Sequence, residues 1–275
     1  ITYLNAGSDQ EYLQNRVSYT YTDEDGDVNT KDDQTYTYYS YDPHGNVKWL
    51  VQDIPGFLDK QYVRYEYDLV SGNVLKVCYN EGKMDQFYHR YMYDADNRIV
   101  SAETSKNNVV WEKDAAYEYY AHGPLRRAEI GEDHVQGLDY IYTIHGWLKA
   151  LNHASLDKTL DPGHDGTNAT NNFAKDVFAM QLGYFTGDFN RTSSPYNSAN
   201  LAALNPATNR SLYNGNISTW ASNNVPHPNS LGVDPYPGLT GYQYRYDELN
   251  RIKTANFRQN VDLSGFSGDV NAYST

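Results

Sequence analysis

Three groups of residues have side chains that could do chemistry. The first is a set of histidines, His44, His122 and His145, each of which is followed by glycine. Histidine rings are common metal ligands. However, the spacings of 78 and 23 residues do not repeat. We therefore expect turn residues whose rings make local hydrogen bonds, and no metal site built from these three rings.

The second group is an acidic run near the N-terminal end. Calcium needs several oxygens that converge on one point. The order D-E-D-G-D in this run does not match the D-x-D-x-D-G spacing of an EF-hand. We expect solvated turn charge, not a metal site, at Asp23, Glu24, Asp25, Asp27, Asp32 and Asp33.

The third is the single cysteine, Cys78, which excludes an intrachain disulfide and a multi-cysteine zinc site. A nucleophilic cysteine needs a base and an electropositive setting, and neither occurs beside Cys78 in the sequence. We therefore expect a packed thiol. No G-x-S-x-G, H-E-x-x-H, phosphate-binding or dinucleotide motif occurs either, so the sequence predicts a protein without catalytic activity, cofactor or metal.

The elements that position these residues form a repeat. Six segments align, at 39–47, 65–74, 91–99, 117–125, 140–148 and 244–252. In the first three copies the fourth residue is aspartate, and these aspartates are 26 residues apart. The repeat positions are Tyr39, Tyr41, Asp42, Gly45, Tyr65, Tyr67, Asp68, Gly72, Tyr91, Tyr93, Asp94, Asn97, Tyr117, Tyr119, Gly123, Tyr140, Tyr142, Gly146, Tyr244, Tyr246, Asp247 and Asn250.

Each copy predicts a strand, a tight turn and a second strand. Two tyrosines at positions i and i+2 point to the same face of a strand. The aspartate that follows can accept hydrogen bonds from backbone N–H groups of the turn. A glycine or asparagine then supplies the positive φ that lets the chain leave the turn. In two copies the aspartate is replaced by Tyr120 and Thr143, and the argument from the aspartate side chain does not apply there.

The composition agrees with an extended sheet. Tyrosine occurs 28 times and phenylalanine 8 times, so we expect a core of half-buried tyrosines. The fold class is therefore all-β, an array of antiparallel β-hairpins that forms a curved or spiral sheet. A single hairpin is marginally stable in water, so neighbouring copies must support each other. The net charge of −13 argues against nucleic acid, and no apolar run is long enough to span a membrane.

At these residues the sequence resembles the RHS family, whose unit is the YD repeat. The pattern is clearest at 91–99 and 244–252. Residues 135–148, 176–185 and 212–218 are similar to stretches found in a bacterial subset of the family.

The resemblance implies a segment of a hollow shell wound from one long β-sheet. In bacterial toxins such a shell encloses a C-terminal toxic domain, and in the animal teneurins a similar barrel belongs to an adhesion receptor. The expected function is a non-catalytic part of a shell that encloses or presents a polypeptide cargo. The expected location is secreted or at the cell surface, although no signal peptide is visible. Expected partners are a cargo polypeptide or neighbouring repeats of a larger chain. The alternative is a carbohydrate- or protein-binding module.

We predict three regions: a repeat array at 1–151, a loop-rich insertion at 152–240, and a resumed repeat at 241–275. The insertion contains 4 of the 28 tyrosines. Alternation predicts a strand at 178–184, although 173–178 fits a helical face about as well. A short helix at 198–204 and a hairpin turn at 213–216 are further expectations. We expect the insertion to decorate the array, the alternative being a separate domain.

Overall fold

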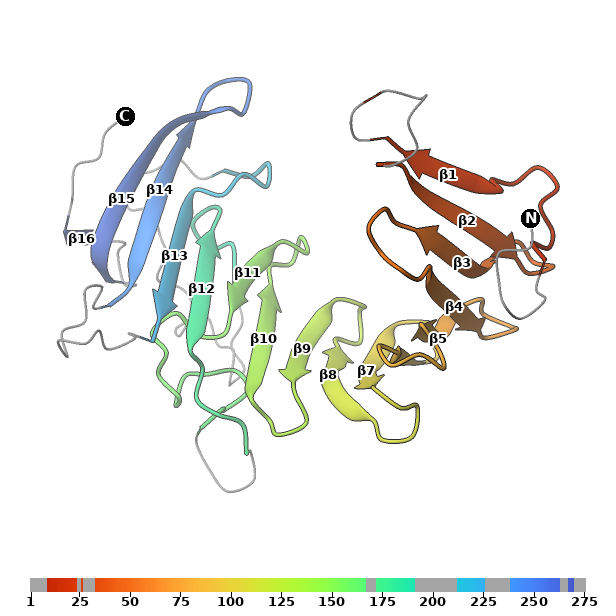
Figure 1. Cartoon of the computed structure of the whole chain (residues 1–275). Coiled ribbons are helices and arrows are strands. Elements are labelled where there is room, and N and C mark those ends of the chain that lie inside the picture. Colours follow the sequence, from red (N-terminus) through yellow and green to blue (C-terminus); the bar gives the residue numbers. More distant parts are fainter. Residues whose placement is uncertain are drawn as a thin grey trace. The chain divides into compact units, whose positions relative to one another are not determined.

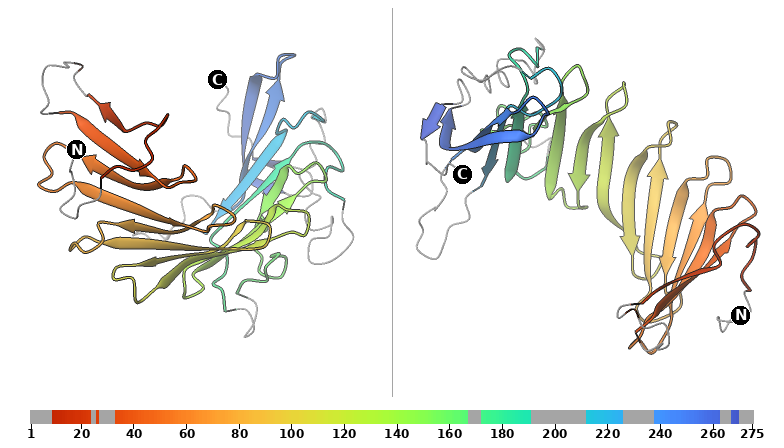
Figure 2. Two further views of the ribbon diagram at one scale, coloured as in Figure 1. Left: turned by 90° about the vertical axis from the view of Figure 1, so that its right-hand side faces the viewer. Right: turned by 90° about the horizontal axis from the view of Figure 1, so that it is seen from above.

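Antiparallel strands that pair in chain order make up two structural units, residues 1–116 and 117–275. The computed structural model describes residues 9–23, 26, 33–166, 172–190, 212–225, 238–262 and 267–269. In each unit consecutive strands lie side by side in one layer (Figures 1 and 2). No helix occurs in these described ranges, and consequently none that could cross a membrane. The predicted all-β array of antiparallel hairpins is confirmed.

The first unit holds seven complete strands and most of an eighth, which contains the boundary between the units. They are β1 (Tyr19–Thr22), β2 (Thr35–Tyr41), β3 (Val47–Asp53), β4 (Gln61–Tyr67), β5 (Val74–Tyr79), β6 (Phe87–Tyr93), β7 (Ile99–Ser105) and β8 (Glu112–Tyr119). The second unit continues with β9 (Leu125–Ile130), β10 (Gln136–Tyr142), β11 (Leu148–Leu151), β12 (Phe178–Gly183), β13 (Thr219–Asn224), β14 (Thr240–Tyr246), β15 (Ile252–Asp262) and β16 (Ser267–Asp269).

Five of the six repeat turns share one pattern of backbone hydrogen bonds, and the turn after Asp68 is one residue longer. In the copy at 91–99, Asp94 Oδ1 accepts the N–H groups of Asp96 (2.9 Å) and Arg98 (3.0 Å), and Arg98 Nε donates to Asp94 Oδ2 (2.8 Å). Thr143 accepts one such bond, from the N–H of Trp147 (3.2 Å). Positive φ occurs at the glycine or asparagine of all six copies, namely Gly45, Gly72, Asn97, Gly123, Gly146 and Asn250.

Backbone bonds alone close the turn in the copy that has no side-chain acceptor. Tyr120 donates its N–H to Pro124 O (2.9 Å) and accepts the N–H of Gly123 (2.9 Å). The corresponding two bonds occur at Asp94, to Arg98 O and from Asn97. The aspartate therefore reinforces the turn, but the turn forms without it.

In five hairpins the strand register shifts between the two tyrosines of the motif. In the antiparallel hairpins β2–β3, β4–β5, β6–β7, β10–β11 and β14–β15 the shift falls immediately before the second tyrosine. A shift of this kind bends the strand and re-aims the side chain that follows it. All twelve motif tyrosines are half-buried, and in β4 the rings of Tyr65 and Tyr67 stack with their centroids 6.2 Å apart.

In four of the six copies the second tyrosine bonds to the backbone of the preceding part of the array. The hydroxyl of Tyr67 on β4 donates to the backbone carbonyl of Val47, which begins β3 (2.8 Å). The hydroxyl of Tyr93 on β6 donates in the same way to Val74, which begins β5 (2.8 Å). Three further hydroxyls, those of Tyr41, Tyr184 and Tyr246, donate to Val17, Leu148 and Ile217 at 2.8–2.9 Å. We call these five bonds the tyrosine clips.

The clips complete the strand ladder where backbone pairing stops. Paired positions between β3 and β4 run from Trp49 with Arg64 to Gln52 with Gln61, so the Val47 carbonyl lies beyond the last pair. Burial raises the pKa of Tyr67 above its ordinary value, so the hydroxyl keeps its proton and remains a donor. Phenylalanine could fill the same space but could not form this bond.

The segment 152–240 contributes strands to the array instead of decorating it. β12 pairs with β11 on one side and with β13 on the other, and β13 pairs with β14. β12 begins at Phe178, as the alternation predicted, and the helical alternative for this stretch does not occur. The predicted helix at 198–204 lies outside the described residues. Small or fully buried residues on the two strands, Ala179, Gln181 and Ala221, allow this close pairing.

Buried apolar residues form small, separate clusters. In the first unit Tyr38, Trp49 and Val51 pack together with Tyr36 and Tyr62 at their margin. In the second unit Ala154, Ala221, Leu239 and Val261 form one cluster, and Ile141 and Ala150, with Phe189 against them, form another. A single layer of strands cannot build one large core, so bonds between neighbouring hairpins carry more of the stability.

The clip can be tested on a single strand. We expect Tyr67→Phe to lower the free energy of unfolding by about 0.5–1.5 kcal/mol, because the hydrogen bond to Val47 O is lost. Tyr65→Phe is the matched control, since none of the described residues accepts or donates a hydrogen bond at the Tyr65 hydroxyl, and its cost should stay within about 0.5 kcal/mol. Urea unfolding measures both. Equal costs for the two variants would contradict the clip.

Candidate functional site

The three histidines lie in turns, as expected. His44, His122 and His145 are exposed. The ring of His145 stacks on Trp147 with centroids 4.8 Å apart, and that of His122 stacks on Tyr120 at 5.3 Å. The one group of potential metal ligands among the described residues is made of aspartates and contains none of these histidines.

The acidic run near the N-terminal end is only partly described. Asp23 Oδ1 accepts the N–H of Gly26 (2.9 Å), and Asp23 Oδ2 accepts Gln34 Nε2 (2.9 Å). These are the bonds of an aspartate that closes a turn. Asp33 is half-buried, and the other members, Glu24, Asp25, Asp27 and Asp32, lie outside the described residues.

Cys78 is fully buried on β5. Burial raises the pKa of its thiol, although Arg64, whose Nη2 lies 3.4 Å from Sγ, opposes this. A thiol with a raised pKa holds little thiolate at neutral pH and is a poor nucleophile. The geometry agrees with a packed thiol.

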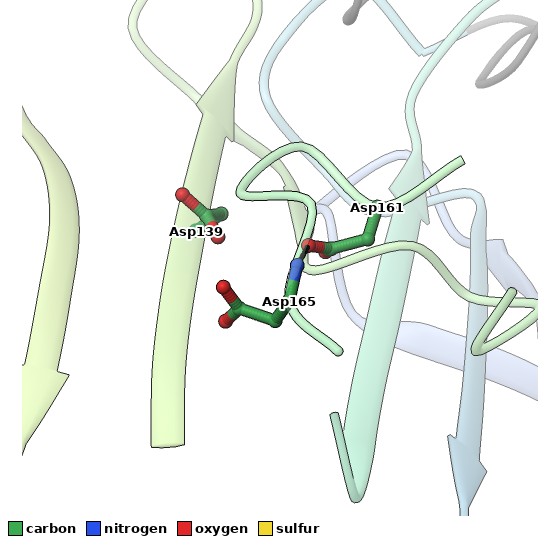
Figure 3. Close-up of side chains that lie close together, drawn as sticks. All are labelled: Asp139, Asp161 and Asp165. Carbon is green, nitrogen blue, oxygen red and sulfur yellow. Dashed lines mark hydrogen bonds between the residues drawn. The ribbon is translucent and has the colours of Figure 1, made fainter. Parts of the chain in front are cut away.

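A site that the sequence analysis did not identify lies in the second unit. Four buried aspartates surround one buried arginine, and we call this group the aspartate–arginine cluster. Arg127 is on β9 and Asp139 on β10, whereas Asp161, Asp165 and Asp176 belong to the connection between β11 and β12. Figure 3 shows Asp161 and Asp165 of this connection opposite Asp139 on its strand. The cluster thus joins the connection to the sheet.

Arg127 lies at the centre of the cluster. Its Nη1 donates to Asp139 Oδ2 (2.5 Å) and its Nη2 to both carboxylate oxygens of Asp165 (2.8 and 3.1 Å). Nε donates to Glu129 Oε1 (3.3 Å). The ring of Phe173 covers the guanidinium at 4.6 Å. Guanidinium groups suit such a site because their donors are planar and forked.

Two glycines leave room for this guanidinium. A Cβ on Gly137 would lie 2.1 Å from Arg127 Nη2, and a Cβ on Gly163 would lie 2.0 Å from Nη1. Neither separation is possible between non-bonded atoms, so any side chain at these positions would displace Arg127. Gly137 on β10 and Gly163 in the connection therefore both lie against the guanidinium of Arg127.

Asn152, directly after β11, links the strands to Asp176. Its backbone N–H donates to Asp139 O (2.8 Å) and its Oδ1 accepts the Asp139 N–H (2.7 Å). Its Nδ2 donates to Asp176 Oδ1 (2.9 Å), which also accepts Gln136 Nε2 (3.2 Å). Asp161 Oδ2 accepts the N–H of Asp165 (2.8 Å). The buried polar groups of this region thus form one connected network.

One arginine does not balance four buried carboxyl groups. Burial raises the pKa of Asp139 to about 7, although Arg127 opposes the shift. Burial, a side-chain hydrogen bond to Asp161 and the charges of the neighbouring aspartates raise the pKa of Asp176 to about 9. Burial would lower the pKa of Arg127, but Asp139 and Asp165 raise it, and Arg127 stays charged. At neutral pH Asp176 therefore carries a proton.

The arrangement can hold the connection on the sheet and can bind a cation. Asp139, Asp161 and Asp165 each offer one oxygen, and the three oxygens lie within 4.8 Å of one another. A polar pocket of about 370 Å³ reaches the cluster, and its lining includes Glu118, Glu129, Asp139, Pro162 and Phe173.

One sequence signal could have led to this site. Aspartate is disfavoured in the middle of a strand, and Asp139 lies in the middle of β10.

The raised pKa values predict a pH dependence in the presence of a chelator. Asp139 and Asp176 hold protons in the folded protein that the unfolded chain releases at its ordinary pKa of about 3.9. Stability should therefore fall as the pH rises from about 4 through 7 to 9. In Asp176→Asn this fall should be shallower, and the variant should be more stable than the wild type at pH 9.

Asp157→Asn is the control for this experiment. Asp157 lies in the same connection, but hydrogen bonds from Thr159 lower its pKa, so it is ionised in both states throughout this pH range. Thermal unfolding of the three proteins at pH 5, 7 and 9 measures the effect. A pH profile of Asp176→Asn that is parallel to that of the wild type would contradict the conclusion that Asp176 carries a proton at neutral pH.

No protein-family model and no curated protein matches the sequence. Among solved structures, the chain is similar to a Photorhabdus luminescens Tc holotoxin pore, with 13% identity and a TM-score of 0.29 over 84% of this chain and 14% of that one. It is also similar to a porin-like protein from Bacteroides uniformis ATCC 8492, with 10% identity and a TM-score of 0.29 over 88% and 86% of the two chains. The chain spans 14% of the Tc holotoxin chain. At this TM-score neither likeness assigns a family or a function.

Proposed function

We propose that this chain is a wall segment of an RHS-type shell that encloses or presents a polypeptide cargo. The observation that carries the proposal is the repeated tyrosine clip. At five places it joins a strand to the neighbouring part of the array, which helps to hold a single layer of strands together without a large core. Such a layer suits a partition, and its partly polar surface would not hold an unfolded cargo as tightly as an apolar one.

The proposal includes a structural role without catalysis and a location outside the cell or at its surface. The aspartate–arginine cluster supports the structural role. Its charged groups bond to one another and join the β11–β12 connection to β9 and β10.

A carbohydrate-binding function is the second candidate. In β1 and β2 the rings of Tyr19, Tyr21, Tyr36 and Tyr38 lie in one row, with stacked or tilted neighbours at 5.8–6.4 Å. Tyr19 and Tyr21 are each 50% exposed. Exposed aromatic faces can stack on sugars. Reproducible binding on a glycan array that Tyr21→Ala abolishes would favour this candidate.

A wall must have an accessible and an enclosed face, and two adjacent residues of β15 can test this. Ala255 pairs with Tyr244 and Asn256 with Gln243. Neighbouring residues of a strand point to opposite faces, and both of these are exposed. Single cysteines would be placed at each position in the full-length gene product, with Cys78→Ala as the common background.

We expect a small maleimide to label both cysteines. A maleimide on a large polymer should label only one of them, because a closed shell excludes it from the inner face. The isolated 275-residue chain is the control, in which both positions should react with the large reagent. Equal rates with the large reagent in the full-length protein would contradict enclosure.

A further inference from the structure

The aspartate–arginine cluster has an unbalanced charge. Arg127 pairs with Asp139 and Asp165, and four carboxyl groups of the cluster are buried around it. The side chains of Asp139 and Asp165 are 3% and 0% exposed, and Asp161 and Asp176 are 2% and 3% exposed. These carboxylates therefore have little contact with bulk water, and burying charge that is incompletely paired is costly.

One carboxylate oxygen of the cluster, Asp161 Oδ1, lacks a hydrogen-bond partner among the described residues. Asp161 Oδ1 is buried and has no hydrogen-bond partner in the described part of the chain, whereas Oδ2 of the same side chain accepts the N–H of Asp165. Buried carboxylate oxygens normally accept hydrogen bonds. A bound cation would give this oxygen a partner.

The geometry suits a cation. Two oxygens bound to one Ca²⁺ lie at most about 5 Å apart, which is twice the Ca–O distance. The oxygens of Asp139, Asp161 and Asp165 meet this limit, lying within 4.8 Å of one another. In Figure 3 their carboxyl groups approach one another from β10 and from the connection. A carboxylate has about four acceptor positions, so Asp139 and Asp165 can bind both Arg127 and an ion.

The donor set selects the kind of ion. All three donors are carboxylate oxygens, which favour hard cations such as Ca²⁺, Mg²⁺ and Mn²⁺ over zinc or copper. Two of the three, Asp161 and Asp165, belong to an irregular connection. Ca²⁺ accepts flexible geometry with six to eight oxygens, whereas Mg²⁺ demands a near-ideal octahedron. The pocket that Asp139 lines gives an ion a path and supplies water ligands.

We propose that Asp139, Asp161 and Asp165 form a Ca²⁺ site that fastens the β11–β12 connection to β9 and β10. Binding supplies a partner for Asp161 Oδ1 and positive charge for the three buried carboxylates. The site is structural, and the proposal is independent of the function of the chain as a shell wall.

The test uses the chain after treatment with EDTA and removal of the chelator. Isothermal titration with CaCl₂ should show one ion per chain, and Ca²⁺ in excess should raise the melting temperature by about 4 °C or more. MgCl₂ at the same concentration should raise it less. Absence of heat together with an unchanged melting temperature at 10 mM CaCl₂, which is roughly ten times the weakest Kd of extracellular calcium-binding modules, would overturn the proposal.

Two variants locate the ion. Asp161→Asn keeps the size of the side chain but should abolish the heat and the shift in melting temperature. Asp133→Asn, which removes an exposed carboxylate from the turn between β9 and β10, is the matched control and should keep both. Circular dichroism establishes that each variant is folded. A folded Asp161→Asn that responds to Ca²⁺ like the wild type would overturn the assignment, and so would loss of the response in Asp133→Asn alone.

Discussion

The hydrogen bond from a tyrosine hydroxyl to a backbone carbonyl at or just before the start of the preceding strand is the interaction on which this fold depends. Each hairpin buries little apolar surface, and the buried apolar residues form small clusters. The clip adds a directed bond between hairpins at the position where the backbone ladder ends. It also explains the composition, since 28 tyrosines against 8 phenylalanines is the ratio expected where the hydroxyl, and not only the ring, is used.

The sequence predicts the local parts of this fold well. Strand pairs, turns and positive-φ positions depend on residues a few positions apart, and the repeat shows them six times. The turn at Tyr120 forms even though its side chain cannot replace aspartate, because the backbone bonds to Pro124 and from Gly123 suffice. The clip was not foreseen. Its acceptor is a main-chain carbonyl 19 to 36 residues away, and every residue has such a carbonyl, so the acceptor cannot be recognised from the sequence.

Contacts across longer separations could not be predicted from one sequence. β12 and β13 lack the tyrosine motif, and they pair because their backbones and small buried residues fit between β11 and β14. Arg127 and Asp165 are 38 residues apart, and the sequence analysis placed Asp165 in a loop-rich insertion. Both misses have the same cause: the partners meet only after the strands have paired in order.

Hydrogen–deuterium exchange of Tyr67→Phe tests the central claim most directly. If the clip couples neighbouring hairpins, amide protection should fall in β3, across the clip, as well as in β4 and β5. The same measurement on Tyr65→Phe should leave protection of β3 unchanged. Loss of protection confined to β4 and β5 in Tyr67→Phe would contradict the account, because each hairpin would then be stable without its neighbour.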